Sequence, residues 1–225
     1  MNSLEDNHED ILAKGMRGLA IGKTDMANRI DLDKSRVDAV LGGEVDDEAV
    51  KAMAEVLGLD AGKLIALSRK AWLPAPREID SLEQFNLPFG NMRVNAYLIW
   101  DESSGKAWAF DTGPQAAPIL ESLDNKGLFL DGIFLTHTHP DHIACLDELR
   151  QGAGNPPVFV HELEGIADSN LIEEGFECTC GNLSIKALHT HGHSVGGTTF
   201  LVGGLLHPIA IVGDALFAGS MGGGM

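Results

Sequence analysis

The sequence predicts a two-domain α+β chain: an all-helical bundle over residues 1–73, a proline-rich linker at 74–78 and a mixed domain over 79–225. Two observations predict this division. Up to residue 73, apolar residues recur at three- and four-residue spacing, as on one face of a helix. All nine prolines and most glycines lie beyond that point, among short apolar runs typical of strands. Because Pro74 and Pro76 cannot continue a helix, we place the boundary there.

Composition and charge narrow the classes of function. Of the 225 residues, 44% are hydrophobic and 22% are charged, a balance typical of a globular protein with a sizeable core. No apolar run reaches the ~18 residues of a membrane span. The acidic start also lacks a secretory signal pattern, so we expect a cytoplasmic protein with no membrane partner. The net charge of -17 repels phosphate backbones and argues against general nucleic-acid binding.

Five short helices are expected in the first domain. Asp33 or Ser35 suits the N-cap of the third helix. Asp46 or Asp47 suits that of the fourth helix, which Gly58 ends. The residues assigned to the buried faces are Leu12, Met16 and Leu19; Met26, Ala27 and Ile30; Val37, Val40 and Leu41; and Val50, Met53, Ala54 and Leu57, with a last helix near 62–68.

This order of helices resembles the helix-turn-helix domains of the Cro/repressor type over residues 10–70. Residues 23–30 are similar to the first helix of the motif, and residues 33–41 are similar to its recognition helix. The residues that the resemblance would place on DNA are Lys34, Ser35 and Arg36.

The same segment departs from that family in its charge. Asp31 stands where the family's turn carries glycine, and Asp33 and Asp38 put negative charge on the recognition helix. Residues 1–73 hold ten Lys and Arg against fourteen Asp and Glu, whereas a DNA reader has a basic footprint. Two interpretations therefore stay open: DNA binding, or a helical bundle for homodimerisation or docking of a protein partner.

Histidines cluster in the second half, where seven of the nine lie between residues 137 and 193. A buried strand is predicted over residues 130–136, followed directly by His137 and His139. On an extended backbone alternate side chains point the same way, so these two rings are expected to converge. A helix should start at Pro140 or Asp141. Imidazoles and a carboxylate so close together predict a divalent transition-metal site.

The second half resembles the metallo-β-lactamase-fold hydrolases over about residues 79–225. The segments that carry the resemblance, in the family's order, are residues 94–99 with 109–113, 136–142, 190–197 and 212–220. The resemblance implies an αββα sandwich of two mixed sheets, with the metals at one edge. It also implies two divalent ions as cofactors, zinc by preference and iron as the alternative.

The resemblance assigns ligands position by position. The implied ligands are His137, His139 and His193 for the first ion, and Asp141 and His142 for the second, with Asp214 shared. Asp141 is also the candidate catalytic residue, because it would orient the metal-activated hydroxide. His161, His189 and His207 are expected to have packing or surface roles.

The implied reaction is hydrolysis of a small ester, thioester or amide, and the motifs are nearest to the hydroxyacylglutathione hydrolases (glyoxalase II). The family has one more histidine ligand for the second metal, in a Pro-Gly-His-Gly segment further along the chain. The sequence stops at Met225, before any such segment. We therefore expect a truncated C-terminus and a weak second metal site. Residues 74–225 hold six Lys and Arg against nineteen Asp and Glu, which favours a small or neutral substrate over a polyanion.

Two rival functions remain. The persulfide dioxygenases also resemble this pattern, with a single iron held by His137, His193 and Asp214. A DNA-binding regulator with a ligand-sensing metallo-domain is the other rival, and it depends on the helical half alone. The identity and number of bound metal ions separate the first rival from the hydrolase.

Overall fold

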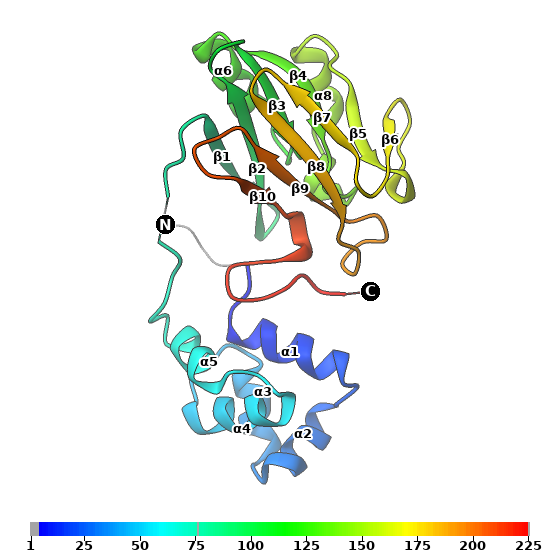
Figure 1. Ribbon diagram of the computed structural model, residues 1–225. Helices are drawn as coiled ribbons and strands as arrows, with labels where there is room; N and C mark the ends of the chain where they lie inside the picture. Colours follow the sequence, from blue (N-terminus) through cyan, green and yellow to red (C-terminus); the bar gives the residue numbers. More distant parts are fainter. Residues whose placement is uncertain (1–4, 76, 225) are drawn as a thin grey trace. The chain divides into compact units, whose positions relative to one another are not determined.

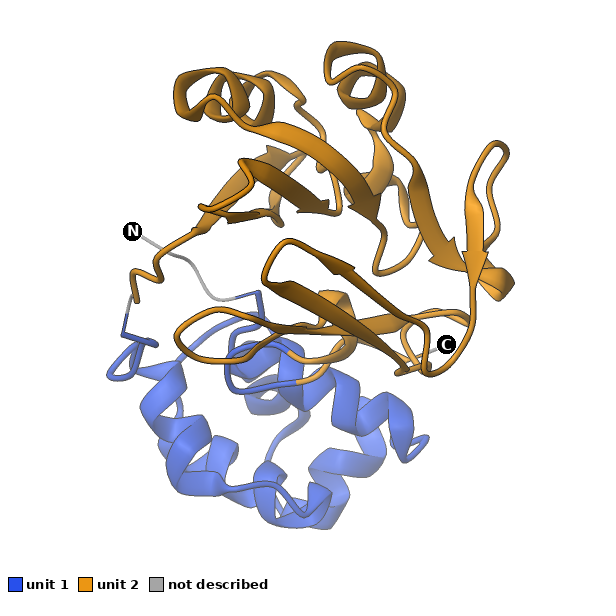
Figure 2. Cartoon of the chain, turned by 45° about the horizontal axis from the view of Figure 1, so that its top comes forward, with its two compact units in different colours: residues 1–76, 217–220 blue, residues 77–216, 221–225 orange. Residues whose placement is uncertain are grey.

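The computed structural model describes residues 5–75 and 77–224, so Pro76 of the expected linker and Met225 lie outside the described residues. The chain divides into two compact units (Figure 2). The helical unit comprises residues 1–76 with 217–220, and the sandwich unit comprises residues 77–216 with 221–225. The linker and domain limits inferred from the sequence remain a prediction.

The described part of the helical unit contains the five expected helices (Figure 1). They are α1 (His8–Gly18), α2 (Lys23–Ile30), α3 (Lys34–Val40), α4 (Asp47–Leu57) and α5 (Ala61–Ser68). Their apolar faces share one core, in which Leu12, Val37 and Met53 are fully buried. Asp46 caps α4 by accepting a hydrogen bond from the Ala49 backbone N–H. Periodicity and capping residues thus account for this unit.

Two details of the helical unit differ from a simple helical pattern. Leu19, expected on the buried face of the first helix, follows the last turn of α1 and is 56% exposed. The chain turns at Ala20, whose φ is positive, and Ile21 fills the core instead. Asp31 ends α2 in the left-handed conformation with a φ of 53°, which Asp tolerates better than most residues. The aspartate is therefore compatible with the turn where the resembling family has glycine.

Two sheets form the sandwich unit. In spatial order, the first sheet has β1 (Leu82–Phe89), β2 (Met92–Asp101), β3 (Lys106–Phe110), β4 (Phe129–Phe134), β5 (Val158–His161) and β6 (Asn170–Ile172). The second sheet has β10 (Ile209–Ile211), β9 (Thr198–Gly203), β8 (Leu183–His189) and β7 (Glu177–Cys180). The first sheet is mixed, since β3 to β6 pair in parallel, and the second is antiparallel.

Helices connect the parallel strands of the first sheet, as parallel pairing requires. They are α6 (Ala117–Lys126) between β3 and β4, and α7 (Pro140–Ile143) and α8 (Leu146–Gly152) between β4 and β5. Among the described residues of the whole chain, no helix has the length and apolar character needed to cross a membrane.

Residue size alternates along β3 and defines the two faces of the first sheet. Ala107 and Ala109 face α6 and α8, where small side chains let the helices pack closely. Trp108 and Phe110 face the second sheet, and Phe134 of β4 lies against both rings, with centroids 5.5 and 5.6 Å away. The described residues of this unit thus form three of the four layers expected for an αββα sandwich: helices, first sheet and second sheet (Figure 2).

The strand predicted over residues 130–136 ends earlier than expected. β4 stops at Phe134, because Leu135 and Thr136 leave the sheet as the chain turns into the histidine loop. As expected, α7 begins at Pro140, where a proline suits the first helical turn.

Several loops reach one edge of the sandwich because of this topology. β3 and β4 are parallel neighbours, so Asp111 and Thr136, which follow them, lie side by side. The backbone N–H of Thr198, the first residue of β9, donates to the Thr136 carbonyl at 2.8 Å and joins the second sheet to this edge. The loop 190–197 and the short helix η2 (Gly213–Ala215) reach the same edge.

Candidate metal centre

Three histidine rings from two loops converge at this edge of the sandwich. His137 Nε2 lies 3.1 Å from His139 Nδ1, and His139 Nδ1 lies 2.8 Å from His193 Nε2. One ligand atom from each ring lies within 4.8 Å of the others. The loop after β4 therefore meets the loop after β8, as the sequence predicted.

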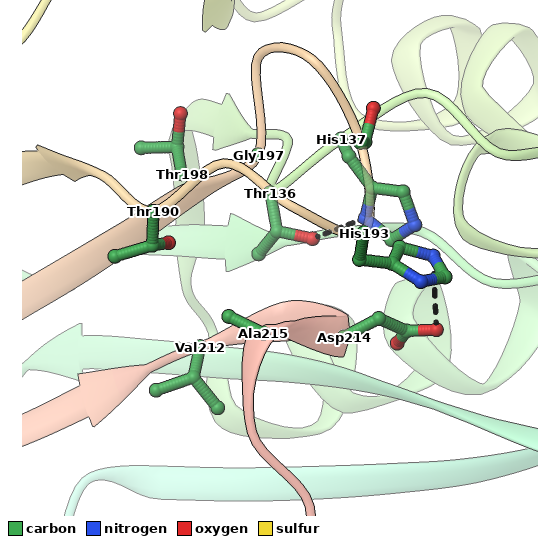
Figure 3. Close-up of a pocket in the computed structure, with 10 residues that line it drawn as sticks. Thr136, His137, Thr190, His193, Gly197, Thr198, Val212, Asp214 and Ala215 are labelled. Atoms are coloured by element: carbon green, nitrogen blue, oxygen red, sulfur yellow. Dashed lines mark hydrogen bonds and ion pairs between the residues drawn. The ribbon is translucent and has the colours of Figure 1, made fainter. Parts of the chain in front are cut away.

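A second group of donors adjoins the first and shares His137 with it. It consists of His137, His142 and Asp214, again with one ligand atom each within 4.8 Å. Asp214 Oδ1 lies 3.2 Å from His142 Nε2. Asp214 Oδ2 lies 3.4 Å from His193 Nε2 (Figure 3). Asp214 thus lies between the two groups, where the sequence resemblance expected a shared carboxylate.

Asp141 lies beside these groups but belongs to neither. Its Oδ2 atom is 3.6 Å from His142 Nε2, and its side chain is one-fifth exposed. The structure therefore brings five of the six predicted metal ligands into two tight groups and leaves Asp141 next to them. Its roles as ligand and as catalytic residue remain a proposal.

Other histidines of the cluster lie outside both groups. His189 ends β8, and its Nε2 is 2.9 Å from the Val195 carbonyl oxygen. His161 is buried, stacks on His189 with a centroid distance of 4.2 Å, and accepts a hydrogen bond from the Leu163 N–H. Both have the packing roles that the sequence pattern indicated.

In three of the four rings, the nitrogen that faces away from the other donors has a partner of its own. These contacts are Thr136 Oγ1 to His137 Nδ1 at 3.0 Å, Asp111 Oδ2 to His142 Nδ1 at 2.9 Å, and the Gly223 carbonyl oxygen to His193 Nδ1 at 2.9 Å. Such partners fix the orientation and tautomer of a ligating imidazole. The Nε2 atoms of these rings are thereby left for the shared centre.

Asp111 holds several groups of the site in place, although the sequence analysis named residues 109–113 only as one of the segments that carry the family resemblance. It is 2% exposed and accepts hydrogen bonds from both the backbone N–H and the hydroxyl of Thr136, each at 2.8 Å. The other side of Thr136 is approached by Gly213, where a Cβ would lie 2.4 Å from Thr136 Oγ1. Glycine is therefore required beside Asp214 for this close approach.

The surroundings of His137 and His142 shift the pKa values of these two histidines in opposite directions. Burial, and next the proximity of His142, lower the pKa of His137 to about 4, so this ring is neutral at pH 7, as a ligand must be. Burial also acts to lower the pKa of His142, but the carboxylates of Asp111 and Asp214 outweigh it and raise that pKa to about 10. The two carboxylates thus favour positive charge at this point, whether a proton or a metal ion carries it.

The donor set fits a divalent transition metal. Ring nitrogens only 2.8 and 3.1 Å apart repel through their lone pairs unless a proton or a cation lies among them. Imidazole nitrogens with one or two carboxylates are the ligands that zinc and iron take in proteins. The residues present therefore suit the metal that the fold implies.

One buried carboxylate near the site was missed by the sequence reasoning. Glu164 is 8% exposed and hydrogen-bonds to both histidine loops, through Thr138 and through Ser194. In the sequence, Glu164 is one of two glutamates just after a short strand, a pattern that is typical of a solvated turn. Its partners are distant in the chain, so no local signal marks it.

The three residues proposed to contact DNA lie in the helical unit. Arg36 donates to both carboxylate oxygens of Asp46, at 2.8 and 2.7 Å, and to Glu48 at 2.9 Å. Lys34 donates to Asp38 at 2.5 Å, and Ser35 is exposed. Both cations are therefore engaged by carboxylates of their own unit.

Comparison with known proteins agrees with this site. Residues 90–223 match the model of the metallo-beta-lactamase superfamily. The chain is 32% identical over 157 residues to the probable metallo-hydrolase YqgX of Bacillus subtilis, covering 60% of this chain and 72% of that protein. A hydroxyacylglutathione hydrolase of Rhodopseudomonas palustris is 36% identical over 107 residues, which is 47% of this chain and 42% of that enzyme. The chain thus spans less than half the length of this relative.

One solved structure is similar to this chain in both fold and sequence. ETHE1 from Myxococcus xanthus superimposes with a TM-score of 0.52 and 28% sequence identity, covering 60% of this chain and 59% of that one. The matched family model covers more than half of the 225 residues and includes both donor groups. The chain belongs to the metallo-beta-lactamase superfamily.

Proposed function

We propose that the sandwich unit is a metal-dependent hydrolase that acts on a small ester, thioester or amide. The proposal rests on the convergence of four imidazoles and a carboxylate at one edge of the sandwich. The residues that would hold the metals are His137, His139 and His193 for the first ion, and His142, Asp214 and Asp141 for the second. A bound divalent ion lowers the pKa of its water to about 7 and polarises a substrate carbonyl.

Three aspartates would assist this hydrolysis in different ways. Asp141, beside His142 and partly exposed, would accept a hydrogen bond from the attacking water. Asp214 contacts His142 and His193 and would keep the two sites at a fixed separation. Asp111 fixes the His142 ring from behind.

The pocket beside the donors supports a small, uncharged substrate. Its lining includes Thr136, Thr190 and Thr198 beside His193 and Asp214 (Figure 3), and it has neither Lys nor Arg among its residues. The lysines of this unit lie elsewhere and are paired: Lys106 with Asp131 at 2.7 Å, Lys126 with Glu83 at 2.8 Å and Lys186 with Glu177 at 3.2 Å. A substrate with several carboxylates, such as a glutathione thioester, would find neither Lys nor Arg in this pocket.

Metal analysis combined with a substrate panel tests the proposal. The purified chain should contain zinc or another divalent ion by mass spectrometry. It should hydrolyse neutral thioesters or esters faster than glutathione thioesters. The His137→Ala variant should lose both the metal and the activity. A metal-free wild type that cannot be reconstituted would refute the proposal.

A second candidate is a dioxygenase with one iron held by His137, His193 and Asp214. The 3.4 Å contact between His193 Nε2 and Asp214 Oδ2 favours it, because it places the carboxylate beside the first group. Two histidines and one carboxylate are the ligand set of iron(II) oxygenases. One iron per chain with oxygen uptake on a persulfide would establish this candidate and exclude the hydrolase.

For the helical unit, the order α2, turn, α3 supports a helix-turn-helix domain, which makes a DNA-binding regulator the third candidate. DNA contact by Arg36 would require it to leave Asp46 and Glu48. A mobility-shift assay at low salt with upstream promoter DNA, using Arg36→Ala as the control, decides it. If no shift occurs, docking of a protein partner or a second copy of the chain is the remaining proposal for this unit.

A further inference from the structure

Glu164 contacts the first histidine loop of the metal centre. It is the last residue of η1 (Glu162–Glu164), the short helix that follows β5. Its Oε2 atom accepts hydrogen bonds from the backbone N–H of Thr138 at 3.1 Å and from the Thr138 hydroxyl at 2.5 Å. Thr138 is the residue between His137 and His139, so the carboxylate holds the peptide that joins two proposed ligands.

The other carboxylate oxygen of Glu164 contacts the second histidine loop. Oε1 accepts hydrogen bonds from the Ser194 hydroxyl and from the Gly196 backbone N–H, the latter at 2.9 Å. Ser194 directly follows His193. A single side chain therefore links two loops that lie far apart in the sequence, and it uses one oxygen for each.

Gly196 shows independently that this contact is built into the fold. A Cβ at this position would lie 2.6 Å from Glu164 Cγ and 3.1 Å from the Glu164 backbone nitrogen. Any larger residue would push the His193 loop away from Glu164. Close approach of backbone to a carboxylate is one of the uses that only glycine permits.

The side chain of Glu164 is both buried and ionised, which is unusual for a residue that has only a packing role. Burial acts to raise its pKa, but the hydrogen bonds from Ser194, Thr138 and Gly196 outweigh it and lower the pKa to about 2. Among the described residues, neither Lys, Arg nor His forms an ion pair with it within 4.0 Å, so its hydrogen-bond partners are all neutral. Burying an ion without a counter-ion is unfavourable, and its hydrogen bonds must compensate.

We propose that Glu164 is a positioning residue that holds His193 against His137 and His139, so that the first metal site depends on it. The inference rests on the proposed metal-dependent function. Among the described residues, its hydrogen bonds join Thr138, Ser194 and Gly196 and none of the proposed ligands, so it acts through Thr138 and Ser194.

The Glu164→Gln variant of the full chain tests this role. An amide keeps the shape but replaces one acceptor oxygen with a donor, so one of the two loops loses its anchor. Cobalt(II) affinity, measured by competition with a chelator, should fall about 10- to 100-fold. The visible absorption bands of bound cobalt should also change, because they report ligand geometry. Glu162→Gln, in the same turn but exposed, should match the wild type in both measurements.

Each outcome decides the proposal. Weaker cobalt binding in Glu164→Gln, with wild-type circular dichroism in the metal-free state, supports it, and equal binding and spectra overturn it. If Glu164→Gln does not fold, Ser194→Ala replaces it, with the same two outcomes. If the wild type binds no cobalt, the metal-dependent function fails separately. The positioning role is then decided by proton NMR of metal-free protein: a contact between the His139 and His193 rings that weakens in the variant supports it, and an unchanged contact refutes it.

Discussion

Charged residues behave differently in the two units of this chain. In the helical unit, several ion pairs are close in sequence: Arg29 pairs with Asp25 four residues away, and Arg36 with Asp46 ten residues away. At the metal centre, His193 meets His139 across 54 residues, and His142 meets Asp111 across 31. In the local pairs, the cation and the carboxylate neutralise each other. The distant groups instead bring histidine and carboxylate donor atoms together, and these donors still require a cation.

This contrast shows how the same residue types acquire different functions. In the helical unit, an exposed pair such as Arg29 with Asp25 lies within one helix and contributes modestly to stability. In the sandwich unit the sheets must form before the donors meet, so the donors depend on the whole fold. Substitutions at the metal centre should therefore change metal binding most. Substitutions in the ion pairs of the helical unit should change only the stability of the fold.

The largest effect is expected for His137→Ala, because His137 belongs to both donor groups. The ion that takes His137 should bind much more weakly, and kcat/KM should fall about 10³-fold or more, since a metal contributes several kcal/mol of transition-state stabilisation. Metal content and hydrolysis of a neutral thioester measure this. His191→Ala, two residues before His193 but outside both groups, is the matched control. Wild-type metal content in His137→Ala would contradict the expected difference between the metal centre and the ion pairs of the helical unit.

A smaller and selective effect is expected for Asp111→Asn. The amide cannot accept all three hydrogen bonds that Asp111 accepts from Thr136 and His142, so the His142 ring loses its orientation. The affinity of the second ion should fall about 10- to 100-fold, as for other partners of ligating histidines. Metal titration followed by mass spectrometry should show the first ion retained. Asp131→Asn, which breaks an ion pair with Lys106 away from the donor groups, should leave both ions in place.

Acid stability provides a third test. Hydrogen bonds lower the pKa of Glu164 from its ordinary 4.5 to about 2, so its contribution to the free energy of unfolding is present above pH 4.5 and is lost as the pH falls towards 2. Over that interval, metal-free wild type should lose stability more steeply than Glu164→Gln. Urea denaturation at several pH values measures the difference. Parallel curves would mean that folding does not lower the pKa of Glu164.

The smallest effect is expected for Arg36→Ala in the helical unit. Its ion pairs with Asp46 and Glu48 are partly exposed and screened by solvent, so the free energy of unfolding should fall only slightly. Asp46 still caps α4 through Ala49, which limits the loss. Chemical denaturation measures the change, and kcat/KM should equal the wild-type value. A clear loss of hydrolysis would show that the two units do not act separately.

Much of this molecule was predictable from local patterns. The five helices followed from apolar spacing and from caps such as Asp46 and Gly58. The convergence of His137 and His139 followed from strand geometry, and the resemblance placed His193 and Asp214 beside them. These predictions depended on short stretches of chain or on motifs of known order.

The remaining features depend on contacts that no short stretch encodes. Glu164 is defined by Thr138 and Ser194, which lie on opposite sides of it in the chain. Leu19 was misassigned because a helical pattern does not show where the chain turns, and Ala20 turns it. Asp141 fits the metal motif in sequence, yet its position beside the groups is decided by the first turn of α7.

The sharing of His137 sets the order in which the centre fills. Its Nδ1 faces Thr136, so only Nε2, with a single lone pair, is left for coordination. One nitrogen cannot serve two ions. If the ion held by His139 and His193 takes it, the other ion is left with His142 and Asp214, with help from Asp141. Occupancy should therefore be stepwise, with two separated dissociation constants, and a half-filled protein should be a stable species.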